Sequence, residues 1–205
     1  AMARLPTVSW LVAPYIMCEH PSATPSYGEA LTAQLLDVLA SNKEVWAKTA
    51  FILNYDENDG FFDHVPPPIP AISSDMGAST VDVTGEVYNG IPFGLGPRVP
   101  MIVVSPWTAG GFVNSQVFDH TSVLRFLETR FGIAAPNISA WRRAVTGDLT
   151  SVFDFSQNGS IEHYRDGMHG MKRADKQCKV PPPNYQDEDL PAQEKGNRPA
   201  RASLE

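Results

Sequence analysis

A continuous apolar run that ends abruptly in acidic residues places the strongest constraint on how this chain can fold. Residues 49–55 read TAFILNY, and the residues that follow read DENDGFFDHVPPP. An uninterrupted apolar run of this length is typical of a strand that is buried on both faces. Asn58, Asp59 and Gly60 favour a turn directly after it. Four carboxylates and a histidine are therefore expected at the end of a buried strand.

Two segments upstream complete a strand–helix–strand order. Residues 6–14 (PTVSWLVAP) are rich in β-branched residues and bounded by prolines, which predicts a second buried strand. Residues 27–40 predict a helix, with Ser26 and Glu29 as a capping box. Its core-facing stripe is expected to be Leu31, Leu35, Val38 and Leu39. This order fits a βαβ unit with parallel strands, in which functional loops lie at the carboxyl ends of strands.

The second half of the chain predicts one more buried strand and two helices. Residues 69–97 contain many polar, Gly and Pro residues and are expected to form a surface excursion with little regular structure. Residues 99–107 (VPMIVVSPW) predict the strand. We expect residues 1–155 to belong to one domain. Residues 156–205 are proline-rich and charged, and predict an irregular tail.

The first of the two helices lies within residues 118–132 (FDHTSVLRFLETRFG), with Asp119 or Thr121 as its cap and a glycine at its end. The second is expected over residues 139–146, with Gly147 as its terminator.

Composition excludes some functions. The chain has 205 residues, a net charge of −7 and no block of Lys or Arg, which argues against nucleic-acid binding. A phosphate-bearing substrate would therefore need a local cation, most simply a metal ion. No apolar run approaches the roughly 18 residues that a membrane span requires. Cys18 and Cys178 leave open whether a disulfide forms.

Asp56 and Glu57 are the candidate metal ligands, since hard divalent cations prefer carboxylate oxygens. Adjacent side chains on an extended strand point to opposite faces, so both can reach one ion only if the backbone turns here. A solvated acidic turn explains the same residues. An EF-hand does not, because Gly60 falls at the fifth position of its loop instead of the sixth.

Three histidines are candidate catalytic residues, and two of them, His20 and His64, have a simpler alternative. His20, beside Glu19, can protonate a leaving group or hold a phosphoryl oxygen, and can equally be a solvated loop residue. His64 can be a ligand, a general acid or a polar loop residue. His120 would feel the positive end of a helix and favour its neutral form. His163 and His169 receive no role.

Phe61 and Phe62, between the acidic turn and His64, are expected to anchor the loop in the core.

Four ordered blocks together resemble a known family. They are EHPS, ILNYDENDGFFDHVPPP, GLGPRVPMIVVSPW and FDHTSVLRFLE, spread over residues 5–155. They resemble the bacterial phosphoesterase family of phosphatidylcholine-type phospholipases C and related acid phosphatases, with mycobacterial phospholipases C as the closest likeness. The resemblance implies an α/β fold, an alkaline-phosphatase-like sandwich with a largely parallel sheet that is present here only in part.

The resemblance also implies roles for individual residues. Asp56 and Glu57 match the acidic pair that binds a divalent metal ion, and His20 matches a histidine near the phosphoryl group. His64 and His120 fall within family motifs as further catalytic residues. The family's amino-terminal block, with a Glu-Asn pair and a Ser or Thr nucleophile, has no counterpart here. The chain is therefore expected to be a carboxyl-proximal part of the enzyme and inactive alone.

The function implied is a phospholipase C, a phosphoric diester hydrolase that cleaves phosphatidylcholine-type lipids to diacylglycerol and a phosphorylated head group. The alternatives are an acid phosphatase acting on soluble phosphomonoesters and a non-catalytic metal- or lipid-binding module. The resemblance further implies peripheral membrane contact, secretion or attachment to the cell envelope or cell wall, and a role in virulence.

Overall fold

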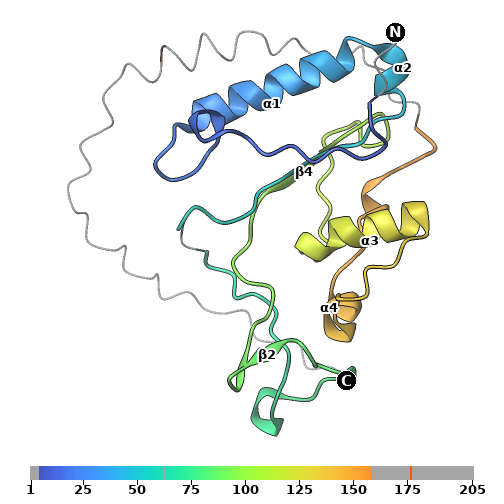
Figure 1. Cartoon of the computed structure of the whole chain (residues 1–205). Coiled ribbons are helices and arrows are strands. Elements are labelled where there is room, and N and C mark those ends of the chain that lie inside the picture. Colours follow the sequence, from blue (N-terminus) through green and yellow to red (C-terminus); the bar gives the residue numbers. More distant parts are fainter. Residues whose placement is uncertain (1–4, 62, 158–175, 177–205) are drawn as a thin grey trace.

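The computed structural model describes residues 5–61, 63–157 and 176. Along these residues two helices come first, four short strands follow, and two further helices come last (Figure 1). The helices are α1 (Pro25–Ala40), α2 (Lys43–Trp46), α3 (His120–Phe131) and α4 (Ala140–Val145). The strands are β1 (Phe51–Asn54), β2 (Val87–Tyr88), β3 (Ile91–Pro92) and β4 (Met101–Val104). Single 3₁₀ turns are η1 (Tyr15–Met17), η2 (Ser74–Met76) and η3 (Thr150–Val152).

Strands β1 and β4 confirm the two apolar runs, but their relative direction differs from the prediction. They pair antiparallel, with Phe51 opposite Val104 and Asn54 opposite Met101. The Tyr55 amide extends the ladder by donating to the Pro100 carbonyl (3.3 Å). The second described pair, β2 with β3, is antiparallel too. A largely parallel sheet is thus not present among the described strands.

The strand expected over residues 6–14 is not formed. The segment has no regular structure, and its apolar side chains face solvent: Trp10 is 68% exposed and Val12 93%. Strand propensity describes how well a side chain fits a pleated surface, and a strand exists only beside a hydrogen-bonding partner. No described strand lies beside this segment, so the first strand of the predicted βαβ unit is missing among the described residues.

Helix α1 is confirmed, but its start and its buried face differ from the prediction. Its N-cap is Thr24, and Pro25 occupies the first turn, where a missing N–H costs nothing. The predicted Ser26–Glu29 capping box is therefore wrong. The buried residues of α1 are the small Gly28, Ala30 and Ala40, whereas Val38 is exposed.

Helices α3 and α4 follow their predicted signals closely. Asp119 caps α3, and the Asp119 backbone amide donates in return to Ser122 Oγ (3.0 Å). Gly132 ends α3 in the left-handed conformation at φ 69°. Ser139 caps α4 by accepting from the Arg142 amide (3.0 Å).

The excursion over residues 69–97 contains only η2 and the β2–β3 hairpin as regular structure, as predicted, and Figure 1 shows this hairpin far from α1. Glu86, immediately before β2, is nevertheless 2% exposed. Among the described residues, the buried hydrophobic side chains come from both halves of the chain: Ala30, Ala40, Trp46, Val123, Ile138, Trp141 and Leu149. No helix within the described ranges is both long and apolar enough to cross a bilayer.

Leu149 offers a test of this small core, because its side chain is 0% exposed. Leu149→Ala should lower the free energy of unfolding by about 2–5 kcal/mol, since it removes buried methyl groups and leaves a cavity. Urea denaturation measures the change. Ile133→Ala, at an exposed position, is the control and should change it by less than about 0.5 kcal/mol. Equal losses in the two variants would contradict this description of the core.

Candidate active site

Three of the sequence blocks meet at Tyr55, the residue directly after β1. Its hydroxyl donates to Glu19 Oε2 (2.7 Å), across 36 positions of sequence. Its backbone carbonyl lies 2.8 Å from His120 Nε2, across 65 positions. A carbonyl oxygen only accepts, so Nε2 is the protonated ring nitrogen in this contact. Tyr55 therefore links the loop that carries His20 and the start of α3 to the acidic loop that begins at Asp56.

The side chain of Glu19 is held between Tyr55 and α1. Gly28 lies under it in the buried face of the helix, and a Cβ atom at Gly28 would collide with Glu19 Cγ. A glycine inside a helix costs about 1 kcal/mol relative to alanine. Here it opens the space through which the Glu19 carboxylate reaches the Tyr55 hydroxyl.

The Tyr55 hydroxyl is affected by this environment. Burial first, and then its hydrogen bond to the negatively charged Glu19, raise the pKa of Tyr55 from 10.0 to about 12. Tyr55 is thus a neutral donor throughout the physiological range.

His20 lies on the exposed loop next to Glu19 and is oriented through its other neighbours. Its Nδ1 is 3.1 Å from Ser22 Oγ, and its ring centroid is 5.8 Å from that of Tyr15. The Tyr15 hydroxyl contacts the same Ser22 Oγ (2.7 Å). These contacts give the imidazole a defined place beside the anchored Glu19. Whether His20 acts on substrate stays a prediction.

Asp56 and Glu57 are both exposed, at the beginning of the predicted turn. Asp59 and Gly60 take the left-handed conformation (φ 58° and 73°), which reverses the chain. Asn58 closes the turn, because its side-chain amide donates to the Phe61 carbonyl (2.7 Å). The backbone therefore turns where the metal prediction requires it.

The carboxylates of Asp56 and Glu57 suit a hard cation and face solvent. Within residues 5–61 and 63–157, however, no three His, Cys, Asp or Glu side chains are grouped so that they could hold a metal ion. The described residues can thus supply only part of a coordination shell, and the metal-binding role of this pair remains a prediction.

An ion pair closes the far end of the acidic loop. Asp63 accepts from Arg98 through the backbone amide (3.1 Å), Nε (2.9 Å) and Nη2 (2.8 Å). The hydrogen bonds from the Arg98 side chain, and then from the Val65 amide, hold the pKa of Asp63 well below its ordinary range. Asp63 is thus a structural carboxylate whose charge Arg98 neutralises.

This ion pair replaces the anchor that the sequence suggested. Phe61 is 74% exposed, so its predicted insertion into the core is wrong. The loop lies at the surface and is held there by the Asp63–Arg98 ion pair, because Phe61 does not enter the core. Phe62 lies outside the described residues.

His64 is not brought to the Tyr55 cluster. It is exposed, and no hydrogen bond described for residues 5–61 and 63–157 joins it to Tyr55, Glu19 or His120. Its catalytic role stays a prediction. Cys18 forms no disulfide among the described residues. Cys178, His163 and His169 lie outside them, so a Cys18–Cys178 disulfide is not tested.

Sequence reasoning gave no role to Tyr55, Glu19 or Arg98. Each lies next to a predicted feature: Tyr55 before the acidic pair, Glu19 before His20, and Arg98 before the third apolar run. A polar or charged residue at the border of a predicted strand or site was the available signal, but its partner is distant in sequence.

Comparison with known proteins identifies the family. The Phosphoesterase family pattern matches residues 1–134. The chain belongs to the phosphoesterase family. The resemblance inferred from the four blocks is thereby confirmed.

The relatives include several bacterial phospholipases C. The chain is 52% identical to a hemolytic phospholipase C of Pseudomonas aeruginosa, over 97% of this chain and 29% of the relative. It is 50% identical to a non-hemolytic phospholipase C of Burkholderia pseudomallei, over 97% of this chain and 30% of the relative. Phospholipase C B of Mycobacterium tuberculosis is 45% identical over 75% of this chain and 30% of the relative. The expected mycobacterial likeness is present, with lower identity and coverage than the other two. The phosphoesterase chain thus spans about three tenths of the length of these relatives.

The raised pKa of Tyr55 gives a direct test of the Glu19 contact. A group whose pKa is raised on folding stabilises the fold below its unfolded pKa, so this contribution should be complete below pH 10 and lost as pH rises toward about 12. Tyrosinate absorbance should show a late-titrating group that disappears in Tyr55→Phe and titrates earlier in Glu19→Gln. Tyr88→Phe, at an exposed tyrosine, is the control and should leave the late step in place. A late step that survives in Tyr55→Phe would contradict the assignment.

Gly28→Ala tests the space beneath Glu19. An alanine normally favours a helix interior by about 1 kcal/mol over glycine. Here its Cβ would displace Glu19, so we expect no gain in thermal stability and a Tyr55 pKa closer to the ordinary value. Thermal unfolding and tyrosinate titration measure the two effects. A stabilised variant with an unchanged Tyr55 titration would show that Glu19 is not held over Gly28.

Proposed function

We propose that this chain supplies part of the active site of a metal-assisted phospholipase C. The observation that carries the proposal is the meeting of three blocks at Tyr55. This residue links the His20 loop and His120 to the acidic loop that begins at Asp56. The substrates are phosphatidylcholine-type lipids, and the products are diacylglycerol and a phosphorylated head group. Similarity to phospholipases C of three bacterial species supports this choice of chemistry.

Asp56 and Glu57 would hold the divalent metal ion together with ligands from outside this chain. Both carboxylates are exposed at a turn, so both are free to face a common ion. The bound ion would neutralise the charge that develops on the phosphoryl oxygens. The identity of the metal follows from neither residue.

His120 would accept a hydrogen bond or a proton, and His20 would donate a proton to the leaving group. Because Nε2 of His120 donates to the Tyr55 carbonyl, Nδ1 is its nitrogen that is left to accept a hydrogen bond or a proton. His20 would give a proton to the diacylglycerol oxygen as that oxygen leaves phosphorus. His64 is a third candidate, to be placed by the parts of the enzyme that lie beyond these residues.

The attacking group would be a Ser or Thr hydroxyl outside this chain. Its oxygen forms a bond to phosphorus as the bond to the diacylglycerol oxygen breaks, and water then hydrolyses the phosphoenzyme. The 205 residues alone should therefore be inactive or nearly so.

The family fold would be completed in the same way. We propose that a largely parallel, alkaline-phosphatase-like sheet forms when the remaining strands are present. The exposed apolar side chains of residues 6–14 support this, since a strand there would bury Trp10 and Val12. β1, which pairs only with β4 among the described strands, offers a free edge.

Lipid contact would be peripheral. Ile16 and Tyr15 are exposed in the η1 turn, four and five residues before His20, where apolar side chains can touch a lipid surface. Secretion or attachment to the cell envelope, and a role in virulence, accompany this proposal by likeness to the family.

Calorimetric titration with Mn²⁺ tests the metal site in the 205-residue chain. Wild type should bind Mn²⁺, and Asp56→Asn should weaken binding at least tenfold because it removes a ligand. Asp59→Asn is the matched control: it removes one charge from the same turn, and Asn accepts the left-handed conformation. Equal binding by wild type and Asp56→Asn would refute the site.

Turnover of a chromogenic phosphocholine ester then separates the functions. Mn²⁺ binding without turnover agrees with a part of a phospholipase C and also with a metal-binding module. Reconstitution with the rest of the enzyme should restore phosphocholine ester cleavage. Substantial metal-dependent turnover by this chain alone would refute the absence of the nucleophile, and a preference for phosphomonoesters after reconstitution would favour an acid phosphatase.

A further inference from the structure

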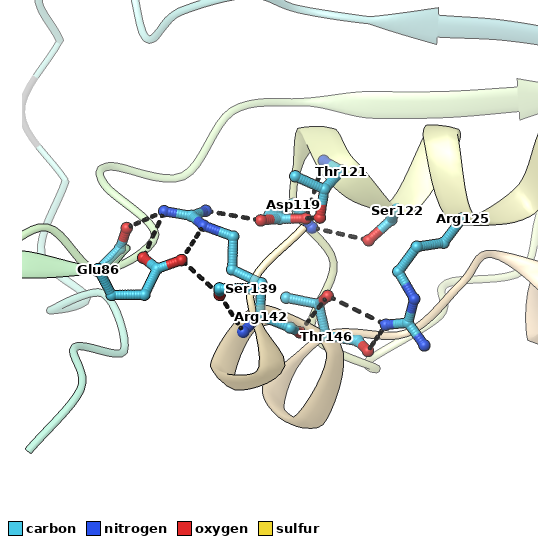
Figure 2. A network of polar contacts seen from close by, with 9 residues as sticks. Glu86, Asp119, Thr121, Ser122, Arg125, Ser139, Arg142 and Thr146 are labelled. Atoms are coloured by element: carbon cyan, nitrogen blue, oxygen red, sulfur yellow. Dashed lines mark hydrogen bonds and ion pairs between the residues drawn. The ribbon is translucent and has the colours of Figure 1, made fainter. Parts of the chain in front are cut away.

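Arg142, on α4, joins three separate parts of the chain (Figure 2). Its Nε and Nη2 donate to the two carboxylate oxygens of Glu86 (2.8 and 3.0 Å), and Nη2 also donates to the Gly94 carbonyl (2.9 Å). Its Nη1 donates to Asp119 Oδ2 (2.7 Å). One guanidinium thus fastens the excursion, on both sides of the β2–β3 hairpin, and the start of α3 to α4.

The two carboxylate oxygens of Asp119 have different partners. Oδ1 accepts from the Thr121 amide (2.9 Å) and hydroxyl (2.6 Å), as the cap of α3. Oδ2 faces Arg142. The cap therefore orders the first turn of α3 internally, whereas Arg142 fixes where that turn lies relative to the rest of the fold.

His120 is the residue directly after this cap and the first of α3. Its imidazole is exposed, and the contact that directs it is the 2.8 Å hydrogen bond to the Tyr55 carbonyl. That bond spans two elements, so it depends on the position of the α3 start.

We infer that Arg142 is a positioning residue that, through Asp119, places the His120 imidazole against the Tyr55 carbonyl beside the Asp56–Glu57 pair. This inference rests on the proposed function for its catalytic meaning, while the placement itself concerns the described residues alone.

The burial of the partners explains why arginine is required. The Glu86 and Asp119 side chains are 3% and 5% exposed, so each carboxylate needs a fixed charged partner. A planar guanidinium can contact both carboxylates and a carbonyl at once, and an ammonium group lacks this fork. Ser139 completes the site by donating to Glu86 Oε1 (2.6 Å).

The neighbouring Arg143 provides a matched control. It lies on the same helix and makes a comparable set of bonds, to both carboxylate oxygens of Glu128 (2.8 Å each) and to the Ala135 carbonyl (2.9 Å). These partners lie in and after the last part of α3, away from His120. Loss of Arg143 should affect stability without moving the His120 ring.

The test is ¹⁵N NMR of the imidazoles in the 205-residue chain, at a pH above the ordinary histidine pKa of about 6.5. In wild type, His120 should show a single tautomer with Nε2 protonated and Nδ1 unprotonated. The exposed His64 is an internal reference for an unrestrained ring. In Arg142→Gln, both ring nitrogens of His120 should shift toward the His64 values, and Arg142→Lys should restore part of the difference.

Asp119→Asn keeps the inference testable if Arg142→Gln fails to fold with two uncompensated carboxylates. Asparagine is a good helix cap, but its side-chain NH₂ would oppose the Arg142 donor. The same His120 shift is expected. Unchanged His120 nitrogens in Asp119→Asn and Arg142→Gln would overturn the inference, as would an equal shift in Arg143→Gln.

A separate measurement keeps the two proposals apart. Mn²⁺ should broaden the backbone signals of Asp56 and Glu57 in the same samples. A lack of broadening would refute the metal site of the proposed function, and the His120 shifts would still decide the role of Arg142.

Discussion

The hydrogen bond between His120 and the Tyr55 carbonyl is the contact on which the arrangement of the candidate site depends. It joins the start of α3 to the end of β1, two elements whose contacting residues are 65 positions apart in the sequence. The Tyr55 hydroxyl adds the loop of Glu19 to the same residue. Tyr55 therefore holds two distant segments next to the acidic loop. Its backbone carbonyl, at the end of β1, binds His120 at the start of α3, and its hydroxyl binds Glu19 beside α1.

Arginines connect the parts of this fold that a small apolar core does not hold. The chain has a net charge of −7, yet Arg98, Arg142 and Arg143 each meet a carboxylate in a hydrogen-bonded pair. An exposed pair such as Arg98 with Asp63 contributes little free energy in general, whereas the carboxylate partners of Arg142 are buried and need their charged partner. All three arginines also set geometry, because a guanidinium in two hydrogen bonds fixes the direction as well as the distance of its partner. Glu128, with its pKa lowered to about 2 mainly by the Arg143 side chain, remains charged in any condition in which the chain is folded near neutrality.

The sequence predicted those features whose causes are local. Helix α3 begins at Asp119 and ends at Gly132 because a cap and a left-handed glycine act within one turn. The turn after β1 is local in the same sense. The direction of β1 relative to β4, and the absence of a strand over residues 6–14, depend on which backbone lies alongside, and no local pattern encodes that.

The residues that organise the site were harder to find for the same reason. Glu86 lies in an excursion rich in glycine, proline and polar residues, a context that predicts solvent exposure, and it is buried by an arginine 56 positions away. Tyr55 could be read as the last aromatic residue of an apolar run. Its function as a link appears only when both of its partners are in place.

The closure of the acidic loop has a further consequence for its length. The loop leaves β1 at Tyr55, whose amide is bound to the Pro100 carbonyl, and it returns at Asp63, which is bound to Arg98. The two ends of the loop are thus bound to Arg98 and Pro100, which lie two positions apart just before β4. Neither Tyr55 nor Asp63 can shift along this segment without losing its hydrogen bond. An inserted or deleted residue must therefore be accommodated in the turn around Asp59. The spacing of the acidic residues along this loop is therefore fixed at both of its ends.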